Sequence, residues 1–125
     1  MNATAALKSY SNNKWTSEVQ GERPEKLIYL LLQKGCELLL RAEHCLKQDD
    51  LNDFHNSTTH CMQILVALRG LLDFENGGEV ATQLAETYDA INSALFRAKR
   101  EKSTGDIRKL YEALSELREG WASIS

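Results

Sequence analysis

Apolar residues recur at intervals of three and four positions along four stretches of this 125-residue chain, a spacing typical of amphipathic helices. The first stretch runs from about residue 24 to 48 and the second from about 50 to 74. The third follows Gly77-Gly78 and continues to about Ala98, and the fourth follows Gly105, with Asp106 near its cap, and reaches Trp121. No stretch shows the alternating pattern of a strand, so the sequence predicts an all-α fold.

Local signals support these boundaries. Pro24 is favoured as a first helical residue, and Asp50, with Asp53 three residues later, is a good N-cap. The glycines at 77 and 78 permit the left-handed backbone that closes a helix, and Glu79 then meets the positive end of the next helix dipole. Because the connections are short and polar, consecutive helices should be antiparallel neighbours. We therefore predict an antiparallel up-down four-helix bundle over residues 24–125.

Residues 1–23 precede this bundle as a separate N-terminal segment. Leu7 and Tyr10 stand at helical spacing in it, followed by a polar stretch around Trp15. Burial of Leu7 and Tyr10 would contribute roughly 1.5–3 kcal/mol each. We expect a short helical or extended segment that packs on the bundle.

Two of the predicted helices carry more apolar residues than one core-facing stripe requires. In the second helix a stripe that includes Phe54 and Leu65 suffices for packing, and in the third a stripe centred on Leu84, Ile91 and Leu95 does so. Either the surplus residues pack inside the bundle, or they form a hydrophobic groove that receives an amphipathic segment of another protein. The groove is our hypothesis. The surplus residues are Ile64, Ala67, Leu71, Ala81, Ala85, Tyr88 and Phe96.

Composition excludes several classes of partner. Fifteen basic and eighteen acidic residues give a net charge of −3, which argues against nucleic acid. The longest apolar run, Leu27 to Leu32, is far shorter than the ~20 residues that span a bilayer, so we expect no membrane insertion. Residues 1–23 contain no apolar core of a signal peptide, and the three cysteines indicate reduced thiols. The sequence thus predicts a cytoplasmic protein.

Histidine and cysteine pairs are the main candidates for chemistry. Adjacent helical residues point about 100° apart, so neither His44-Cys45 nor His60-Cys61 chelates a metal alone. The Glu-x-x-His pattern of di-iron bundles is absent, and no nucleophile comes with a positioned histidine and acid. We predict no metal, no cofactor and no enzymatic activity. A basic cluster at the end of the third helix fits the helix dipole, with a minor role in holding a client as the alternative; it comprises Arg97, Lys99, Arg100 and Lys102.

One alternative function comes from residues 44–47. The run His44-Cys45-Leu46-Lys47 resembles the H-x-L-K-G of histidine phosphotransfer domains, which are also four-helix bundles. Gln48 replaces the glycine, and His44 is near the predicted helix end instead of at its middle. A phosphotransfer domain remains an alternative, as does a self-associating helical bundle that has no client.

Four segments together resemble the flagellar secretion chaperone family, the export chaperones of flagellin. Residues 71–89, LLDFENGGEVATQLAETYD, match the pattern LD-x-E-x-GGE-[IV]-A-x-x-L-x-x-x-YD. Residues 24–28 resemble the S-P-x-K-L-I entry into the first long helix, and residues 115–121 the closing L-R-x-x-W. Leu7 to Tyr10 resembles an N-terminal hydrophobic-x-x-Tyr, so the match extends from Leu7 to Trp121.

The chain departs from the family pattern at two places. The segment before Pro24 reads Gly21-Glu22-Arg23 where the family has T/S-A-S, so the usual hydroxyl cap is missing. The Asp-Gly pair of the first long helix is Gln33-Lys34 here, with Gly35 one place late.

The resemblance implies a function. Proteins of this family bind the disordered C-terminal segment of flagellin and keep it unpolymerised until export. It also implies contact with the flagellar export apparatus and sometimes with an anti-sigma factor. In this family the N-terminal segment can occupy part of the client's site, so residues 1–23 are expected to act as a displaceable lid with Tyr10 as its anchor. We expect a monomer, with a homodimer as the alternative.

Overall fold

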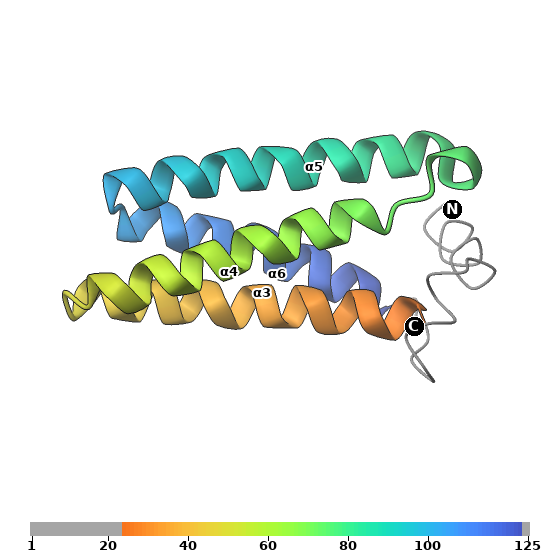
Figure 1. Cartoon of the computed structure of the whole chain (residues 1–125). Helices are drawn as coiled ribbons and strands as arrows, with labels where there is room; N and C mark the ends of the chain where they lie inside the picture. Colours follow the sequence, from red (N-terminus) through yellow and green to blue (C-terminus); the bar gives the residue numbers. More distant parts are fainter. Residues whose placement is uncertain (1–23, 124–125) are drawn as a thin grey trace.

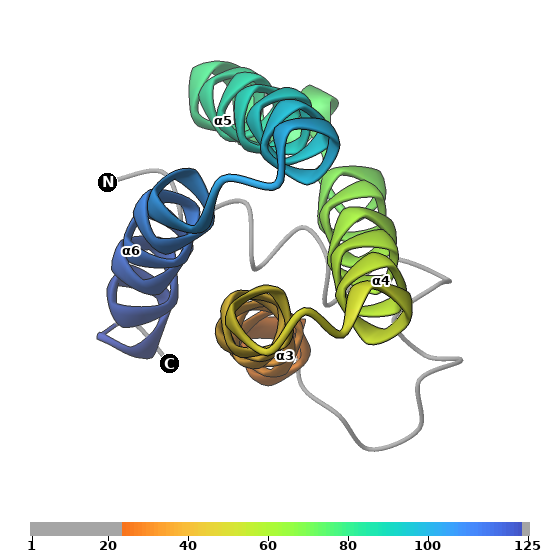
Figure 2. The ribbon, with the colours of Figure 1, turned by 90° about the vertical axis from the view of Figure 1, so that its left-hand side faces the viewer.

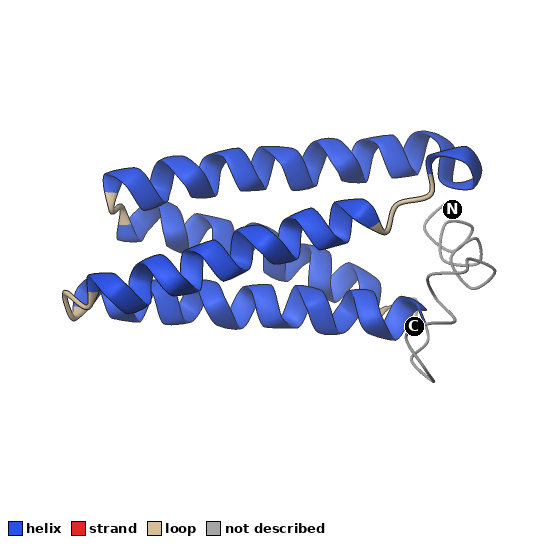
Figure 3. Cartoon of the chain, in the orientation of Figure 1, coloured by secondary structure: helices blue, strands red, loops and turns tan. Residues whose placement is uncertain are grey.

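The computed structural model describes residues 24–123, which form four helices that run alternately in opposite directions (Figure 1). No strand occurs in this range (Figure 3). The predicted all-α bundle is therefore confirmed, whereas the expectations for Leu7, Tyr10 and the rest of residues 1–23 lie outside the described residues. The helices are α3 (Pro24–Lys47), α4 (Leu51–Gly70), α5 (Phe74–Glu101) and α6 (Thr104–Ala122).

Each helix packs mainly against the helices next to it in a closed ring of four, seen end-on in Figure 2. α3 packs closely against both α4 and α6, whereas α5 contacts α4 and α6 less extensively. Among residues 24–123, α5 is thus the helix least closely packed against its neighbours.

The core takes large side chains from all four helices. Tyr88 and Trp121 each belong to one of the sequence motifs that resemble the chaperone family. Both side chains are buried in the core, so both stabilise the packing of the bundle. Burial raises the pKa of the Tyr88 hydroxyl to about 12. The largest side chains that are almost completely buried include Leu32, Leu39, Phe54, Leu65, Leu68, Leu95, Ile107 and Leu114.

The turn between α3 and α4 is built as the sequence predicts. Asp49 has a left-handed backbone with φ of 59°, which ends α3. Asp50 is the N-cap of α4, and its carboxylate accepts a hydrogen bond of 3.2 Å from the backbone N–H of Asp53.

The connection between α4 and α5 differs from the sequence prediction. α4 ends at Gly70 instead of Phe74, and α5 begins at Phe74, before the glycine pair. The reason is Asp73, an N-cap that the sequence analysis missed, whose carboxylate accepts hydrogen bonds of 3.1 Å from the N–H groups of Glu75 and Asn76. Gly78, with φ of 54° and ψ of −131°, is non-helical and separates this first turn from the long part of α5. The predicted break at the glycine pair is therefore present, and the difference is the extra turn that begins at Phe74.

The last connection shows the same kind of shift. Ser103 caps α6, and its hydroxyl accepts a hydrogen bond of 3.2 Å from the N–H of Asp106. α6 consequently starts at Thr104, one residue before the glycine that the sequence suggests as the boundary.

Candidate partner-binding groove between α4 and α5

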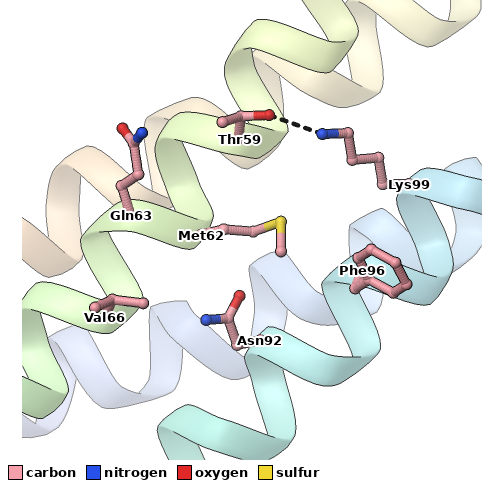
Figure 4. A pocket seen from close by; sticks show the side chains of 7 residues that line it. All are labelled: Thr59, Met62, Gln63, Val66, Asn92, Phe96 and Lys99. Atoms are coloured by element: carbon pink, nitrogen blue, oxygen red, sulfur yellow. Dashed lines mark hydrogen bonds between the residues drawn. The ribbon is translucent and has the colours of Figure 1, made fainter.

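A groove of about 410 Å³ lies between α4 and α5 (Figure 4). Its lining residues recur every three or four positions on each helix, so each helix presents one stripe to the groove. The two stripes run in opposite directions because the helices are antiparallel. The lining residues are Thr59, Met62, Gln63 and Val66 of α4 and Asn92, Phe96 and Lys99 of α5.

A second hollow of about 470 Å³ adjoins the groove and shares Met62, Asn92 and Phe96 with it. Asp89, Ser93 and Arg97 of α5 complete its lining. Phe96 belongs to both hollows, so an occupant of either would contact its ring.

Three of the seven lining residues, Met62, Val66 and Phe96, are apolar, and two of these three are exposed. Phe96 is 53% exposed and Val66 is 62% exposed, and they are two of the five large apolar side chains classed as exposed among residues 24–123. Met62 is half-buried and extends from α4 toward α5 (Figure 4). Exposure of apolar side chains to water is unfavourable, so their burial against another apolar surface would lower the free energy.

Polar contacts connect α4 to α5 at the two ends of the apolar stretch. At one end Lys99 Nζ donates a hydrogen bond of 2.7 Å to Thr59 Oγ1 (Figure 4). At the other end Arg69 Nε donates hydrogen bonds of 2.9 and 3.1 Å to the Asp89 carboxylate. These ends are ten residues apart on α4, which corresponds to about 15 Å of helix.

One polar residue of the groove, Asn92, has an unsatisfied side-chain atom. Its Oδ1 atom is buried and has no hydrogen-bond partner among residues 24–123. A buried acceptor without a partner costs free energy, so a donor that reached Asn92 would lower that cost.

The structure separates the residues that the sequence analysis assigned to the groove. Phe96 lines it, Ala67 is exposed outside its lining, and Leu71 is half-buried in the connection after α4. The other four are in the interior, so the expectation that Ile64 forms a groove wall with Phe96 is corrected: Ile64 is 5% exposed and packs in the core. The buried four are Ile64, Ala81, Ala85 and Tyr88.

Most of the lining residues do not belong to the predicted outer stripe. That stripe lies one position away on α4, at 64, 67 and 71, whereas the groove uses 59, 62, 63 and 66. The signal that could have found it is the pair Met62 and Val66, two apolar residues at i and i+4 on a helix face whose other residues, Thr59, Gln63 and Arg69, are polar.

The three cysteines are poorly placed to act as nucleophiles. All three thiols are buried, and burial raises the pKa of Cys61 to about 12, so the nucleophilic thiolate is disfavoured. His44 is exposed in the last turn of α3, away from the middle of a helix where phosphotransfer would place it.

One group of potential metal ligands brings Cys45, Asp50 and Asp53 within 4.8 Å of one another. Each donor already has a contact in the chain, and the Cys45 thiol donates a weak hydrogen bond of 3.8 Å to Asp53 Oδ2. Asp50 caps α4, and Arg41 donates to the Asp53 carboxylate at 2.6 Å and holds the pKa of Asp53 below its usual range. The arrangement is that of a capped helix start with an ion pair.

Among residues 24–123, no helix is both long enough and apolar enough to cross a bilayer.

The family model and the relatives that match this chain all belong to the same family. The family described as flagellar protein FliS matches residues 6–125. The flagellar secretion chaperone FliSB of Pseudomonas aeruginosa is 30% identical over 125 residues, covering all of this chain and 99% of the relative. FliS of Salmonella typhimurium is 30% identical over 126 residues, with 100% and 93% coverage, and FliS of Campylobacter jejuni is 27% identical over 124 residues, with 99% and 94% coverage. The chain therefore belongs to the FliS family of flagellar secretion chaperones.

Proposed function

We propose that this protein binds the C-terminal segment of flagellin in the groove between α4 and α5 and keeps that segment from polymerising before export. The observation that carries the proposal is the exposure of Phe96 and Val66 on facing helices of an open groove. An amphipathic helix that docks there would cover both side chains at once.

Membership in the FliS family supports a client from the flagellar export pathway. The relatives are named as flagellar secretion chaperones, and chaperones are not a class of enzymes. The protein would act by binding alone, since holding a client unpolymerised requires no bond to be made or broken. The resemblance in sequence implies that the segment which the protein binds is the C-terminus of flagellin.

The free energy of binding a disordered client is compatible with a reversible complex. A disordered client that folds as it docks typically buries on the order of 1,000–3,000 Å² and gives up several kcal/mol to ordering. The groove accommodates only about 15 Å of such a client, so the rest of the segment would follow other parts of the bundle surface. Such a complex is specific, yet an export apparatus can dissociate it.

Other assignments belong to the same proposal. The protein would work in the cytoplasm, where flagellin is synthesised, and would contact the flagellar export apparatus and an anti-sigma factor. Residues 1–23 would act as the displaceable lid.

The direct test is calorimetric titration of the purified protein with a peptide of the flagellin C-terminus. We expect saturable binding, a rise in helicity measured by circular dichroism, and slower polymerisation of intact flagellin. Lack of binding would contradict the proposal. A doubled mass in light scattering without peptide would instead support self-association, and labelling of His44 by a phosphodonor would support phosphotransfer.

A further inference from the structure

We infer that the groove between α4 and α5 selects a helical segment that carries a carboxylate one turn beyond its apolar anchor, and that this carboxylate binds Lys99. The inference rests on the proposed function, because it specifies the chemistry of the segment that the same groove receives.

Lys99 is placed as a recognition residue. It follows Phe96 by three positions, so its ammonium lies one turn from the exposed ring on the same face of α5. The stem of Lys99 is half-buried, and its Nζ atom reaches across the groove to Thr59 Oγ1 at 2.7 Å. The side chain is thus already held in the groove before an occupant arrives.

Thr59, the hydrogen-bond partner of Lys99, carries no negative charge to balance the ammonium. A neutral hydroxyl accepts the hydrogen bond of Lys99, and no carboxylate among residues 24–123 lies within ion-pair distance of Nζ. A carboxylate adds to the hydrogen bond the Coulomb attraction between opposite charges, which a neutral hydroxyl cannot supply. A carboxylate that enters the groove would therefore replace Thr59 as the partner of Lys99.

Other cations near Lys99 also favour a carboxylate as the group that the client places there. Arg100 is stacked over the Phe96 ring, with its guanidinium carbon 5.8 Å from the ring centroid. Arg97 lines the adjoining hollow, and Lys102 caps the end of α5. Neither these three residues nor Lys99 forms an ion pair within residues 24–123. Glu101 and Asp106 share a neighbouring hollow with Arg97, but neither lines the groove. Among residues 24–123, the one charged residue that lines the groove is Lys99, so a negative charge is attracted to this end.

The opposite end of the groove differs. There Arg69 is already paired with Asp89, so that end offers no uncompensated cation to a client. An occupant helix therefore has a preferred direction: its apolar anchor covers Phe96 and Val66, and its carboxylate lies at the end near Lys99.

The experiment compares Lys99→Met, Thr59→Val and wild type in titrations with the flagellin C-terminal peptide. Both variants remove the hydrogen bond between Lys99 and Thr59, but only Lys99→Met removes the cation. We expect Lys99→Met to weaken binding roughly tenfold at 0.1 M salt and less than about threefold at 1 M, where the Debye length falls to about 3 Å. Thr59→Val should bind at least as tightly as wild type. Lys109→Met, the same charge change at an exposed position of α6, is the control and should bind like wild type.

A second series identifies the carboxylate. Each acidic residue of the peptide is replaced by its amide and titrated against wild type and Lys99→Met. One replacement should weaken binding to wild type but not to Lys99→Met, because the two changes remove the same interaction. Equal weakening by Lys99→Met and Thr59→Val, or a peptide with no acidic residue coupled to Lys99, would overturn this inference alone. A peptide that fails to bind wild type would overturn the proposed function, and this inference with it.

Discussion

Gly35 of α3 lies so close to Leu114 of α6 that a Cβ atom on residue 35 would stand 2.7 Å from Leu114 Cδ2. Leu114 is fully buried, so its side chain has little room to move away. The Cys61 thiol of α4 donates a weak hydrogen bond of 3.7 Å to the Gly35 carbonyl oxygen. Three helices thus meet at this glycine, which explains a glycine in the middle of a long helix.

Gly35→Ala should therefore destabilise the protein. Overpacking typically costs about 1–3 kcal/mol, and alanine recovers about 1 kcal/mol of helix propensity, so we expect a net loss of roughly 1 kcal/mol. Urea denaturation measures it. Gly120→Ala is the matched control, because a Cβ atom there meets nothing within 4 Å and should stabilise α6. Stabilisation of equal size at both positions would show that Leu114 moves aside freely.

An ion pair between α3 and α6 makes stability depend on pH. Arg108 donates two hydrogen bonds, of 2.6 and 3.0 Å, to the mostly buried Glu43 carboxylate. The Arg108 guanidinium lowers the pKa of Glu43 below its usual range, although burial acts in the opposite direction. A carboxyl whose pKa is lower in the folded state stabilises the fold above its unfolded pKa of about 4.3, and this stabilisation is lost as the pH falls through the folded pKa.

Glu43→Gln should consequently lower the free energy of unfolding at pH 7 and leave a shallower decline between pH 5 and 3. Denaturant titrations of wild type and variant at each pH measure the difference, which should shrink as the solution is acidified. Glu86→Gln, at an exposed position of α5, serves as the control. A difference between wild type and Glu43→Gln that stays constant from pH 7 to pH 3 would contradict the linkage.

The number and type of helices could be predicted from the sequence because each helix has its own apolar period. Asp50 was also predictable as a cap, since its signal is local. The break at Gly77-Gly78 was predictable for the same reason, and the backbone is non-helical at Gly78. The extra turn from Phe74 was not, because the lone cap Asp73 is a weaker signal than the glycine pair that follows it.

The site was harder to predict because it depends on how two helices face each other. The periodicity of α4 does not show whether Ile64 or Met62 points toward α5, since both lie on apolar stripes. The structure places Ile64 against Gly35 and Leu114 in the core and Met62 in the groove. Phe96 was assigned correctly to the outer face, because its neighbours Leu95 and Ile91 already fill the core stripe.

Removal of residues 1–23 tests the predicted lid. If the segment competes with the client, deletion should tighten binding of the flagellin peptide and speed association, because a lid lowers apparent affinity by the fraction of time it is closed. The melting temperature of the bundle should change little. Tyr10→Ala, which removes the expected anchor, should have a smaller effect in the same direction. Weaker binding after deletion would place the segment within the client site instead.

Two exposed phenylalanines on α5 allow the central claim to be tested with a matched control. Phe96 lines the groove and is 53% exposed, whereas Phe74 is 46% exposed outside its lining. Each has an arginine over its ring, Arg100 at 5.8 Å and Arg69 at 5.9 Å. The two side chains differ in place, because Phe96 lines the groove whereas Phe74 lies outside its lining, in the first turn of α5 before Gly78.

The most direct measurement is titration of Phe96→Asp and Phe74→Asp with the flagellin C-terminal peptide, together with the melting temperature of each variant. Phe96→Asp should weaken binding by about thirtyfold or more, as expected for the loss of a buried aromatic anchor, while both variants melt close to wild type. Phe74→Asp should bind like wild type. Equal affinity of wild type and a folded Phe96→Asp would contradict the assignment of the client to the groove between α4 and α5.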